Sequence, residues 1–307
     1  MLNQKIREIG SSREIAVNDI ASSFIVEAIN GYEIRQRYAR GNKTQSHGRS
    51  RFAQELQDTG RSETEGRAYL VPGRFFGDEW IFNVRGEETL VDRVLVADQH
   101  VPWPSLSHDL GRCLAALHDH STEHGLPTPV GPDAYLRLDA WFKGLSRDFY
   151  GAHFNPVVRE SIGDPVWSTL SAWCQALVRA TETTTCHGQF GMGTFSVLEN
   201  NPVLEVLTGP ALCIAHPSSD IGYYIGELLE MSRTDRISPE DFQQALQSFE
   251  AGYGRALMPE DFRAGILRIL MHQHDYVAYA PSGATWSVAG TTITSNLAGR
   301  GYLSVAL

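Results

Sequence analysis

The chain has little of what several classes of protein require. Its 307 residues include four cysteines, and no two of them have the Cys-x-x-Cys spacing of a zinc site or redox motif. No apolar run approaches the length that spans a membrane, and the segment from Met1 to Arg7 lacks the apolar stretch of a secretory signal. We therefore expect a protein of the reducing cytoplasm with no membrane partner.

Positive charge is also scarce. Lys and Arg total 26 against 36 Asp and Glu, which leaves a formal net charge of −10. Nucleic acids and anionic membrane surfaces are bound by clustered basic side chains, so this balance argues against both as partners. Hydrophobic residues, by contrast, make up 42% of the chain. That supply is ample for a substantial core, either in one two-lobed unit or in two domains.

The most specific pattern lies between residues 186 and 231. It opens with a glycine-rich loop, Cys186-His187-Gly188-Gln189-Phe190-Gly191-Met192-Gly193-Thr194. Turn-forming residues at Pro217-Ser218-Ser219-Asp220 then precede a helical stripe of apolar residues, at Ile221, Tyr224, Ile225, Leu228 and Leu229. This arrangement puts the Asp220 carboxylate beside the positive end of a helix, where it can accept backbone N–H bonds.

These two segments together resemble the aminoglycoside phosphotransferase and choline kinase family. The resemblance lies in His-Gly-x-Phe-Gly-x-Gly followed by Pro-x-x-Asp-Ile-Gly-x-x-x-Gly-Glu-Leu, and more thinly extends over residues 10–230. It implies an α+β, bilobal, protein-kinase-like fold. Residues 1–86 would form a small lobe with an antiparallel sheet and one helix, and residues 87–307 a larger, mainly helical lobe that carries the His187 loop.

The signature polar residues of that family are replaced here. Gln189 stands at the position of the base, Thr194 at that of the metal-binding Asn, and Thr208 at that of the metal-binding Asp. Glutamine cannot act as a base, although it can orient a hydroxyl. A magnesium site without a carboxylate is unusual, so we assign no metal ligand and leave binding of both ATP and Mg open. His187 is the group that could take a proton, or it could be structural, and the resemblance implies that Asp220 holds the loop.

The resemblance also indicates nucleotide-binding positions in the small lobe. A tight turn at Gly10-Ser11-Ser12-Arg13, between strand-like runs at residues 2–9 and 15–29, would cover the phosphates. A cation on the strand-like segment 31–38 would bind them, a Glu on a helix near residues 63–70 would pair with that cation, and backbone groups at a hinge would bind the base. The candidates are Ser11 and Ser12, Arg35, Glu65, and Val84 and Gly86. A plain turn, a solvated arginine and surface carboxylates are the alternatives.

Periodicity organises the remainder of the chain. Residues 39–64 are poor in large apolar side chains and predict a long polar loop, whereas residues 75–86 predict a hairpin. Apolar stripes predict helices over 106–118 and from about residues 164, 239 and 259. We expect His118 to be a core or capping residue, and His272 and His274 to belong to a helix end rather than to a metal site.

Three functions fit these residues. The first is an ATP-dependent phosphotransferase acting on Ser or Thr hydroxyls of a ribosomal precursor peptide, together with a partner lyase that removes the phosphate. This reading follows from a likeness to the phosphotransferase-like proteins of class V lanthipeptide and thioamitide pathways, carried by the Cys186-His187-Gly188 loop and the Leu207-Thr208-Gly209 turn. The alternatives are a pseudokinase that serves as a binding or scaffold subunit, and a kinase for small antibiotic-type hydroxyl compounds.

Overall fold

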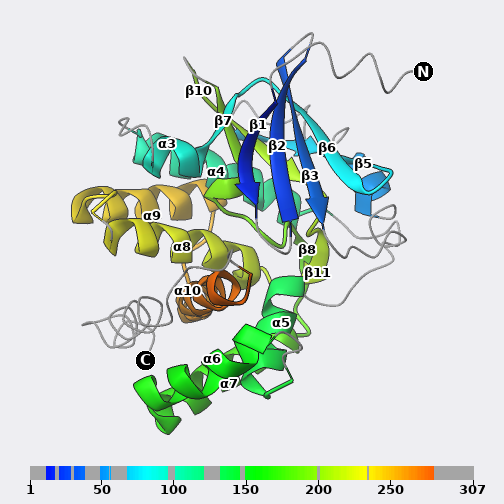
Figure 1. Cartoon of the computed structure of the whole chain (residues 1–307). Coiled ribbons are helices and arrows are strands. Elements are labelled where there is room, and N and C mark those ends of the chain that lie inside the picture. Colours follow the sequence, from blue (N-terminus) through cyan, green and yellow to red (C-terminus); the bar gives the residue numbers. More distant parts are fainter. Residues whose placement is uncertain are drawn as a thin grey trace. The chain divides into compact units, whose positions relative to one another are not determined.

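The computed structural model describes residues 12–17, 21–28, 31–38, 49–54, 56, 68–95, 101–120, 132–145, 149–198, 201–233 and 235–279. The chain divides into two compact units (Figure 1). Unit 1 comprises Met1–Pro127, Gly191–Leu212 and Pro239–Arg255, and unit 2 comprises Thr128–Phe190, Cys213–Ser238 and Ala256–Leu307. Unit 1 includes helices that the sequence assigns to the larger lobe, and a lobe boundary at residue 86 remains a prediction.

Unit 1 is built on an antiparallel five-stranded sheet with the order β1-β2-β3-β6-β5. Its strands are β1 (Ser12–Val17), β2 (Ala21–Ala28), β3 (Gly31–Tyr38), β5 (Arg74–Phe76) and β6 (Glu79–Val84). One face carries a buried cluster to which β3 and β6 contribute alternate residues: Ile34, Trp80, Phe82 and Val84. The hairpin predicted over residues 75–86 is confirmed, with a turn at Gly77 and Asp78.

A second sheet in unit 1 has the order β4-β10-β9-β7. It consists of β4 (Ala68–Pro72), β7 (Glu88–Thr89), β9 (Phe195–Leu198) and β10 (Asn201–Thr208), with β4 and β10 parallel. Helices α3 (Leu90–Leu95), α4 (Trp103–His118) and α9 (Pro239–Tyr253) and the short helix η2 (Met192–Thr194) complete the unit. Helices α4 and α9 pack closely, because a side chain at Gly111 would meet the Tyr253 backbone nitrogen at 2.8 Å.

Unit 2 is mainly helical. It contains α5 (Asp133–Phe142), α6 (Phe149–Ile162), α7 (Asp164–Val178), α8 (Ser218–Arg233) and α10 (Pro259–Tyr279), with a short antiparallel pair, β8 (Thr184–Cys186) and β11 (Cys213–Ala215). Its core centres on Trp141, whose indole contacts the rings of Phe142, Phe154 and Trp167. The helices predicted from apolar stripes near residues 106, 164, 221, 239 and 259 are confirmed.

Two expectations for the N-terminal strands are wrong. Ser12 and Arg13 lie in β1, paired with Val26 and Ile25, rather than in a tight turn. The strand expected over 15–29 is instead the end of β1 and the whole of β2, separated by residues 18–20.

The expected small-lobe helix near Ala68 is also misplaced. Residues Ala68–Pro72 form β4, because they pair with β10 in the middle of the second sheet. Helical residues lie instead at 49–54, inside the predicted polar loop, where Phe52 and Ala53 are buried. Tertiary packing overrides a weak local pattern in both places.

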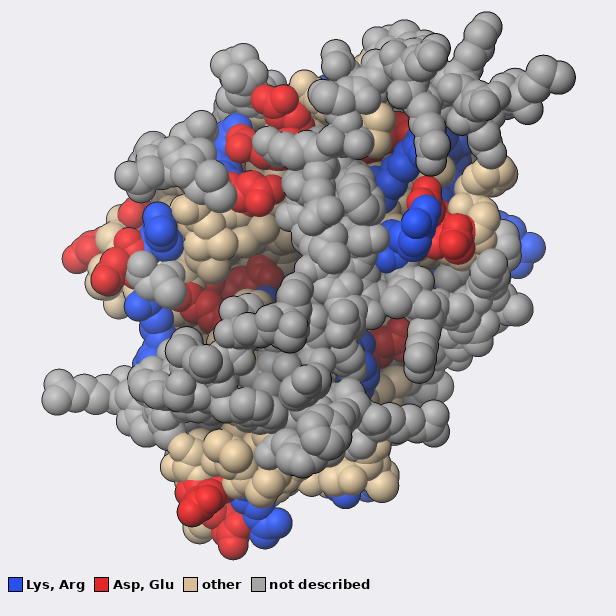
Figure 2. All heavy atoms as spheres, in the orientation of Figure 1, with Lys and Arg blue, Asp and Glu red and all other residues tan. Residues whose placement is uncertain are grey.

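Among the described residues, no helix is long and apolar enough to cross a membrane. On the face shown in Figure 2, acidic and basic side chains lie interspersed in small groups among the described residues.

The crossing of α8 and α10 explains the glycines of the Gly-x-x-x-Gly motif in residues 222–226. A Cβ at Gly222 would lie 2.7 Å from the backbone carbon of Ala264, and one at Gly226 would lie 2.7 Å from the carbonyl oxygen of Gly265. Backbone atoms cannot move aside as side chains can, so only glycine permits this approach.

We expect Gly222→Ala to lower the free energy of unfolding by about 2 kcal/mol, in the range of overpacking substitutions. Gly193→Ala is the matched control, because a Cβ there meets no atom within 4 Å. Urea denaturation of both variants measures the difference. Equal urea midpoints for Gly222→Ala and Gly193→Ala would show that α8 and α10 can move apart without a loss of stability.

Candidate functional site

The loop after β8 is held by the carboxylate of Asp220, in the first turn of α8. Its Oδ2 accepts the backbone N–H of His187 at 2.6 Å, and its Oδ1 accepts that of Gly188 at 2.8 Å. Asp220 is fully buried. Gly188 has a φ of +83°, a conformation that favours glycine. The carboxylate therefore fixes two consecutive peptide groups of the loop, which is the arrangement that the sequence resemblance implies.

His187 forms part of the support of this loop. Its side chain is buried, and its Nδ1 accepts the backbone N–H of Gln189 at 3.3 Å. A neutral ring then carries its proton on Nε2. The ring packs edge-on against Phe190, which in turn contacts Tyr224. Gln189 is partly exposed, so of these two predicted catalytic residues it is the one whose side chain reaches the surface of unit 2.

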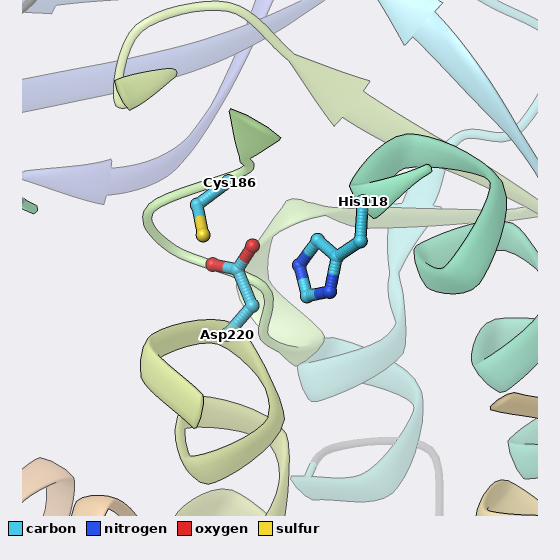
Figure 3. Close-up of side chains that lie close together, drawn as sticks. All are labelled: His118, Cys186 and Asp220. Carbon is cyan, nitrogen blue, oxygen red and sulfur yellow. The ribbon is translucent and has the colours of Figure 1, made fainter. Parts of the chain in front are cut away.

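Cys186 lies directly before the loop and beside Asp220 (Figure 3, which also draws His118 from unit 1). Its thiol donates to the carbonyl oxygen of Ala215 at 3.4 Å and is fully buried. Burial, together with the charge of Asp220, raises the pKa of the Cys186 thiol well above its usual range. All four cysteines are buried, and none of them forms a disulfide. Cys186 is therefore a neutral packing residue rather than a nucleophile.

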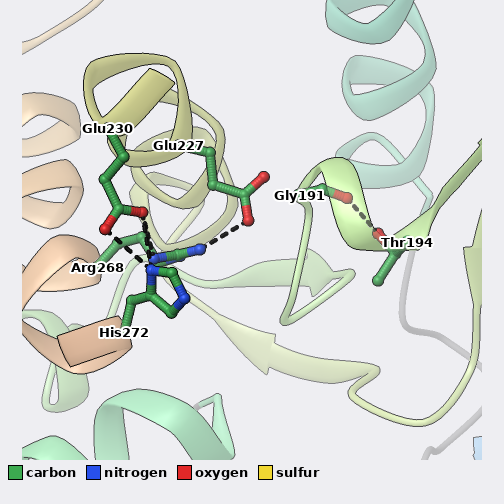
Figure 4. Close-up of polar contacts among 6 residues, drawn as sticks. All are labelled: Gly191, Thr194, Glu227, Glu230, Arg268 and His272. Carbon is green, nitrogen blue, oxygen red and sulfur yellow. Dashed lines mark hydrogen bonds and ion pairs between the residues drawn. The ribbon is translucent and has the colours of Figure 1, made fainter. Parts of the chain in front are cut away.

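Thr194 and Thr208, both in unit 1, do not fit a magnesium ion. The Thr194 hydroxyl donates to the carbonyl oxygen of Gly191 at 2.8 Å, within its own helical turn (Figure 4). The Thr208 hydroxyl donates to the carbonyl oxygen of Val206 at 2.9 Å, and the residue is fully buried. Magnesium is bound in proteins through carboxylates, and neither position supplies one. We therefore derive no catalytic step through a metal at these residues.

The chain directly after Thr208 is packed closely against its surroundings in unit 1. A side chain at Gly209, which has a φ of +152°, would meet the Trp80 ring at 3.0 Å. The Nη1 of Arg49 donates to the carbonyl oxygen of Pro210 at 2.6 Å. Arg49 is buried and belongs to the helical residues that the sequence did not predict. This arginine ties that helix to the segment after β10.

At the predicted hinge, Val84 is part of the core and the backbone groups of Gly86 are bonded inside unit 1. Val84 is buried in the core of unit 1. The N–H of Gly86 is donated to Oε2 of Glu205 at 3.2 Å, and its carbonyl oxygen accepts the Ser196 hydroxyl at 3.3 Å. The N–H of Gly86 is therefore already used inside the protein. Recognition of a base by this particular group, as the resemblance implies, is not compatible with this conformation.

The structure describes two of the remaining small-lobe candidates, Arg35 and Ser12. Arg35 donates through Nε and Nη2 to the Glu33 carboxylate, at 3.1 and 2.6 Å. Both side chains lie on the face of β3 opposite Ile34, because alternate residues of a strand face opposite ways. The Arg35 charge is thus neutralised by its neighbour. Ser12 lies in β1, and Ser11 and Glu65 lie outside the described residues.

A buried ionic cluster joins α8 to α10 (Figure 4). Arg268 donates to Glu227 at 2.7 Å and to Glu230 at 2.9 Å, and its guanidinium lies 4.6 Å from the centre of the Tyr223 ring. His272 bonds to Glu230 at 2.9 Å, whereas His274 bonds to Asp275 at 3.0 Å. Each of the two histidines thus bonds to a carboxylate, and α10 continues past them to Tyr279.

His118 is a packing residue as well, as expected. Its Nδ1 lies 2.7 Å from the Tyr253 hydroxyl, in the contact between α4 and α9. Sequence reasoning gave no site role to Glu205, Arg49 or Arg268. Glu205 was visible in principle, because it is the charged residue in the apolar strand Val203-Leu204-Glu205-Val206-Leu207. A charged residue in a buried apolar strand either has hydrogen-bonding or ionic partners or serves a function.

No protein-family model and no curated protein matches the sequence. Solved structures do match over nearly the whole chain. Spectinomycin phosphotransferase, in complex with ADP and spectinomycin, matches with a TM-score of 0.59 and 12% identity, covering 99% of this chain and 97% of its own. Choline kinase from Streptococcus pneumoniae matches with a TM-score of 0.58 and 11% identity, covering 97% of both chains.

A third match is macrolide 2′-phosphotransferase from Brachybacterium faecium, with a TM-score of 0.53 and 18% identity, covering 95% of this chain and 93% of its own. Identities this low carry the architecture and nothing finer. The α+β fold expected from the loop and helix motifs is confirmed: this chain has the protein-kinase-like fold of the aminoglycoside phosphotransferases and choline kinases.

Proposed function

We propose that this protein is a phosphotransferase that moves the terminal phosphoryl group of ATP to a Ser or Thr hydroxyl of a ribosomal precursor peptide. A partner lyase would then eliminate the phosphate. The observation that supports the proposal is the clamp of Asp220 on the backbone of His187 and Gly188. The clamp keeps the loop in one shape and leaves Gln189 partly exposed at its tip.

Phosphoryl transfer depends mainly on positioning and on charge stabilisation. The Gln189 amide can donate to and accept from a hydroxyl, so it can orient the attacking oxygen. An oxygen–phosphorus bond forms, the bond to ADP breaks, and the hydroxyl proton leaves to water, because an amide cannot hold it. General acid–base catalysis contributes roughly 10²- to 10⁴-fold in rate, and the base position of this chain holds a glutamine. We therefore expect slow turnover.

The peptide is proposed because Cys186-His187-Gly188 and Leu207-Thr208-Gly209 resemble the corresponding segments of phosphotransferase-like proteins in lanthipeptide and thioamitide pathways. Small molecules are the alternative, since the matching structures include a spectinomycin phosphotransferase and a choline kinase.

Mass spectrometry of a candidate precursor peptide tests the proposal. The peptide is incubated with ATP, magnesium and this protein, with and without a co-encoded lyase. We expect a phosphate adduct without the lyase and loss of water with it. Gln189→Ala and His187→Ala should reduce the adduct by about 10²-fold, whereas Gln243→Ala, on the exposed face of α9, should not. No adduct and no water loss would refute transfer to a peptide.

A second candidate is a pseudokinase that binds the peptide or the lyase without transferring phosphate. The buried Thr208, whose hydroxyl donates to Val206 instead of facing outward, favours it. Binding of the peptide or lyase by wild-type protein, without any adduct, would support this candidate.

A further prediction concerns Thr194 and Thr208, which stand where the family has its metal ligands. We expect magnesium to add little to any stabilisation by ATP, because Thr194 and Thr208 both donate to backbone carbonyls. Ligand at 100 times its Kd stabilises a protein by about 2.7 kcal/mol, which a thermal shift assay detects. Melting temperatures with ATP and EDTA, and with ATP and magnesium, should agree. A large magnesium-dependent shift that disappears in Thr208→Ala would contradict this.

A further inference from the structure

Two cysteines face each other in the short antiparallel pair of unit 2. Cys186 ends β8 and Cys213 begins β11, and the two residues are directly opposite in the register of these strands. Residues in such positions have side chains on the same face and Cα atoms about 4.5 to 5.5 Å apart. A disulfide requires a Cα separation of about 4.4 to 6.8 Å. The backbone therefore already has the spacing that a disulfide between these two residues needs.

The side chains of the two cysteines also lie together. Cys186, Cys213 and Ala215 form a buried cluster of their own, and both cysteines are fully buried. The Cys186 thiol donates to the carbonyl oxygen of Ala215 at 3.4 Å, which is a weak bond because sulfur is a weak donor. Turning this thiol toward Cys213 therefore sacrifices only a weak hydrogen bond.

We propose that Cys186 and Cys213 are a redox-sensitive pair, which closes into a disulfide when the protein meets hydrogen peroxide. One thiolate attacks the peroxide and becomes a sulfenic acid, with release of one water. The second thiol attacks that sulfur, the S–S bond forms, and a second water leaves. The two sulfurs give up two electrons, and the peroxide is reduced to two molecules of water. Formation of this disulfide does not depend on the proposed function.

In the reduced protein the two thiols are packing residues, and they react slowly. Burial raises the pKa of the Cys186 thiol well above its usual range, so the thiol keeps its proton while the strands are paired. Each strand of the pair has three residues, and an isolated sheet of two such strands is marginally stable. Elements of low local stability open without global unfolding. The reaction with peroxide therefore proceeds from the opened pair.

The disulfide acts on the loop that Asp220 holds. Cys186 lies beside Asp220 (Figure 3), and the carboxylate accepts the N–H groups of His187 and Gly188, the next two residues along the chain. A cross-link ties the residue before the loop to β11, so openings that break these two bonds become rarer. We expect hydrogen exchange of both amides to slow by about 10-fold or more.

Peroxide treatment of the folded protein, followed by denaturation and alkylation, tests the proposal. Before treatment, all four cysteines should be alkylated. After treatment, Cys186 and Cys213 should resist alkylation. Cys113 in α4 and Cys174 in α7 are controls that are equally buried, and they should still react.

Peptide mapping identifies the bond. Cleavage after Glu199 and Glu205 places Cys186 and Cys213 on separate peptides, which should stay joined until a reductant is added. Cys213→Ser is the matched variant, because it replaces one sulfur by oxygen and changes little else. Its peroxide-treated form should give no joined peptides and no slowing of exchange at His187.

Alkylation of all four cysteines to the same extent after peroxide would overturn the proposal. Oxygen adducts on Cys186 without joined peptides would also overturn it. Joined peptides with unchanged exchange of His187 and Gly188 would establish the pair and refute its effect on the loop. None of these measurements uses ATP or a peptide substrate, so a failure of the proposed function leaves their result unaffected.

Discussion

Asp220→Ala is expected to lower the free energy of unfolding by roughly 3 to 5 kcal/mol, and to abolish any phosphoryl transfer. The carboxylate is fully buried and accepts the N–H groups of His187 and Gly188. Each buried donor left without a partner costs about 1–3 kcal/mol, and bonds to a charged acceptor lie at the upper end. The loop would lose the two bonds that define its shape, so Gln189 would no longer be held.

Urea denaturation and hydrogen exchange measure this effect. Asp220→Asn should be intermediate, because the amide oxygen can accept one N–H while the amide nitrogen faces the other. Asp78→Ala, in the exposed turn between β5 and β6, is the control and should stay within about 0.5 kcal/mol of wild type. Stability of Asp220→Ala equal to that of the control would mean that the loop is held by other contacts.

Arg268→Met should destabilise the protein by roughly 3 to 5 kcal/mol at neutral pH, the range for breaking a buried ion pair. Arg268 is buried and bridges Glu227 and Glu230. Methionine fills most of the space but leaves both carboxylates without their cation. Replacing these carboxylates by glutamine in the same chain should recover much of the loss. Arg159→Met, which removes an exposed pair with Asp164, should change stability by less than about 1 kcal/mol.

The loss in Arg268→Met should also depend on pH. Burial alone would raise the pKa of Glu230, but Arg268 and His272 outweigh it and hold the pKa below its ordinary value of 4.5. Glu230 therefore stabilises the wild type above that value, and this contribution fades as the pH falls through the lowered pKa. Without Arg268, burial prevails and the pKa of Glu230 rises. Protonation of Glu230 then removes the buried charge that destabilises the variant. The difference between the two proteins should shrink from pH 7 to pH 4, and a constant difference would contradict this account.

Local patterns predicted most of the helical structure. The stripe from Ile221 to Leu229 and the Ser238-Pro239-Glu240 start signal need only neighbours along the chain, and α8 and α9 follow them. Patterns failed where distant segments decide. Tyr69 and Leu70 are strand residues because β10 lies beside them, and Phe52 is helical and buried in a stretch whose average composition is polar.

The predictions for the candidate site also succeeded in one part and failed in another. The family resemblance of the segments around His187 and Asp220 implied that this carboxylate holds the loop, and in the structure it accepts the N–H groups of His187 and Gly188. Arg35 shows the limit of this reasoning. Residue type made it a candidate cation, but the pairing of β3 with β6 decides that it faces away from Trp80 and binds Glu33.

By itself, the sequence determined the protein-kinase-like fold, the helices with clear apolar stripes and the replacements at Gln189, Thr194 and Thr208. Only the tertiary structure decided that the Thr208 hydroxyl faces the Val206 carbonyl and that Glu205 takes the N–H of Gly86. The reason is physical. Helix periodicity and turn chemistry depend on neighbours a few residues apart, whereas the partner of a buried polar group is set by strands and helices brought together from distant parts of the chain.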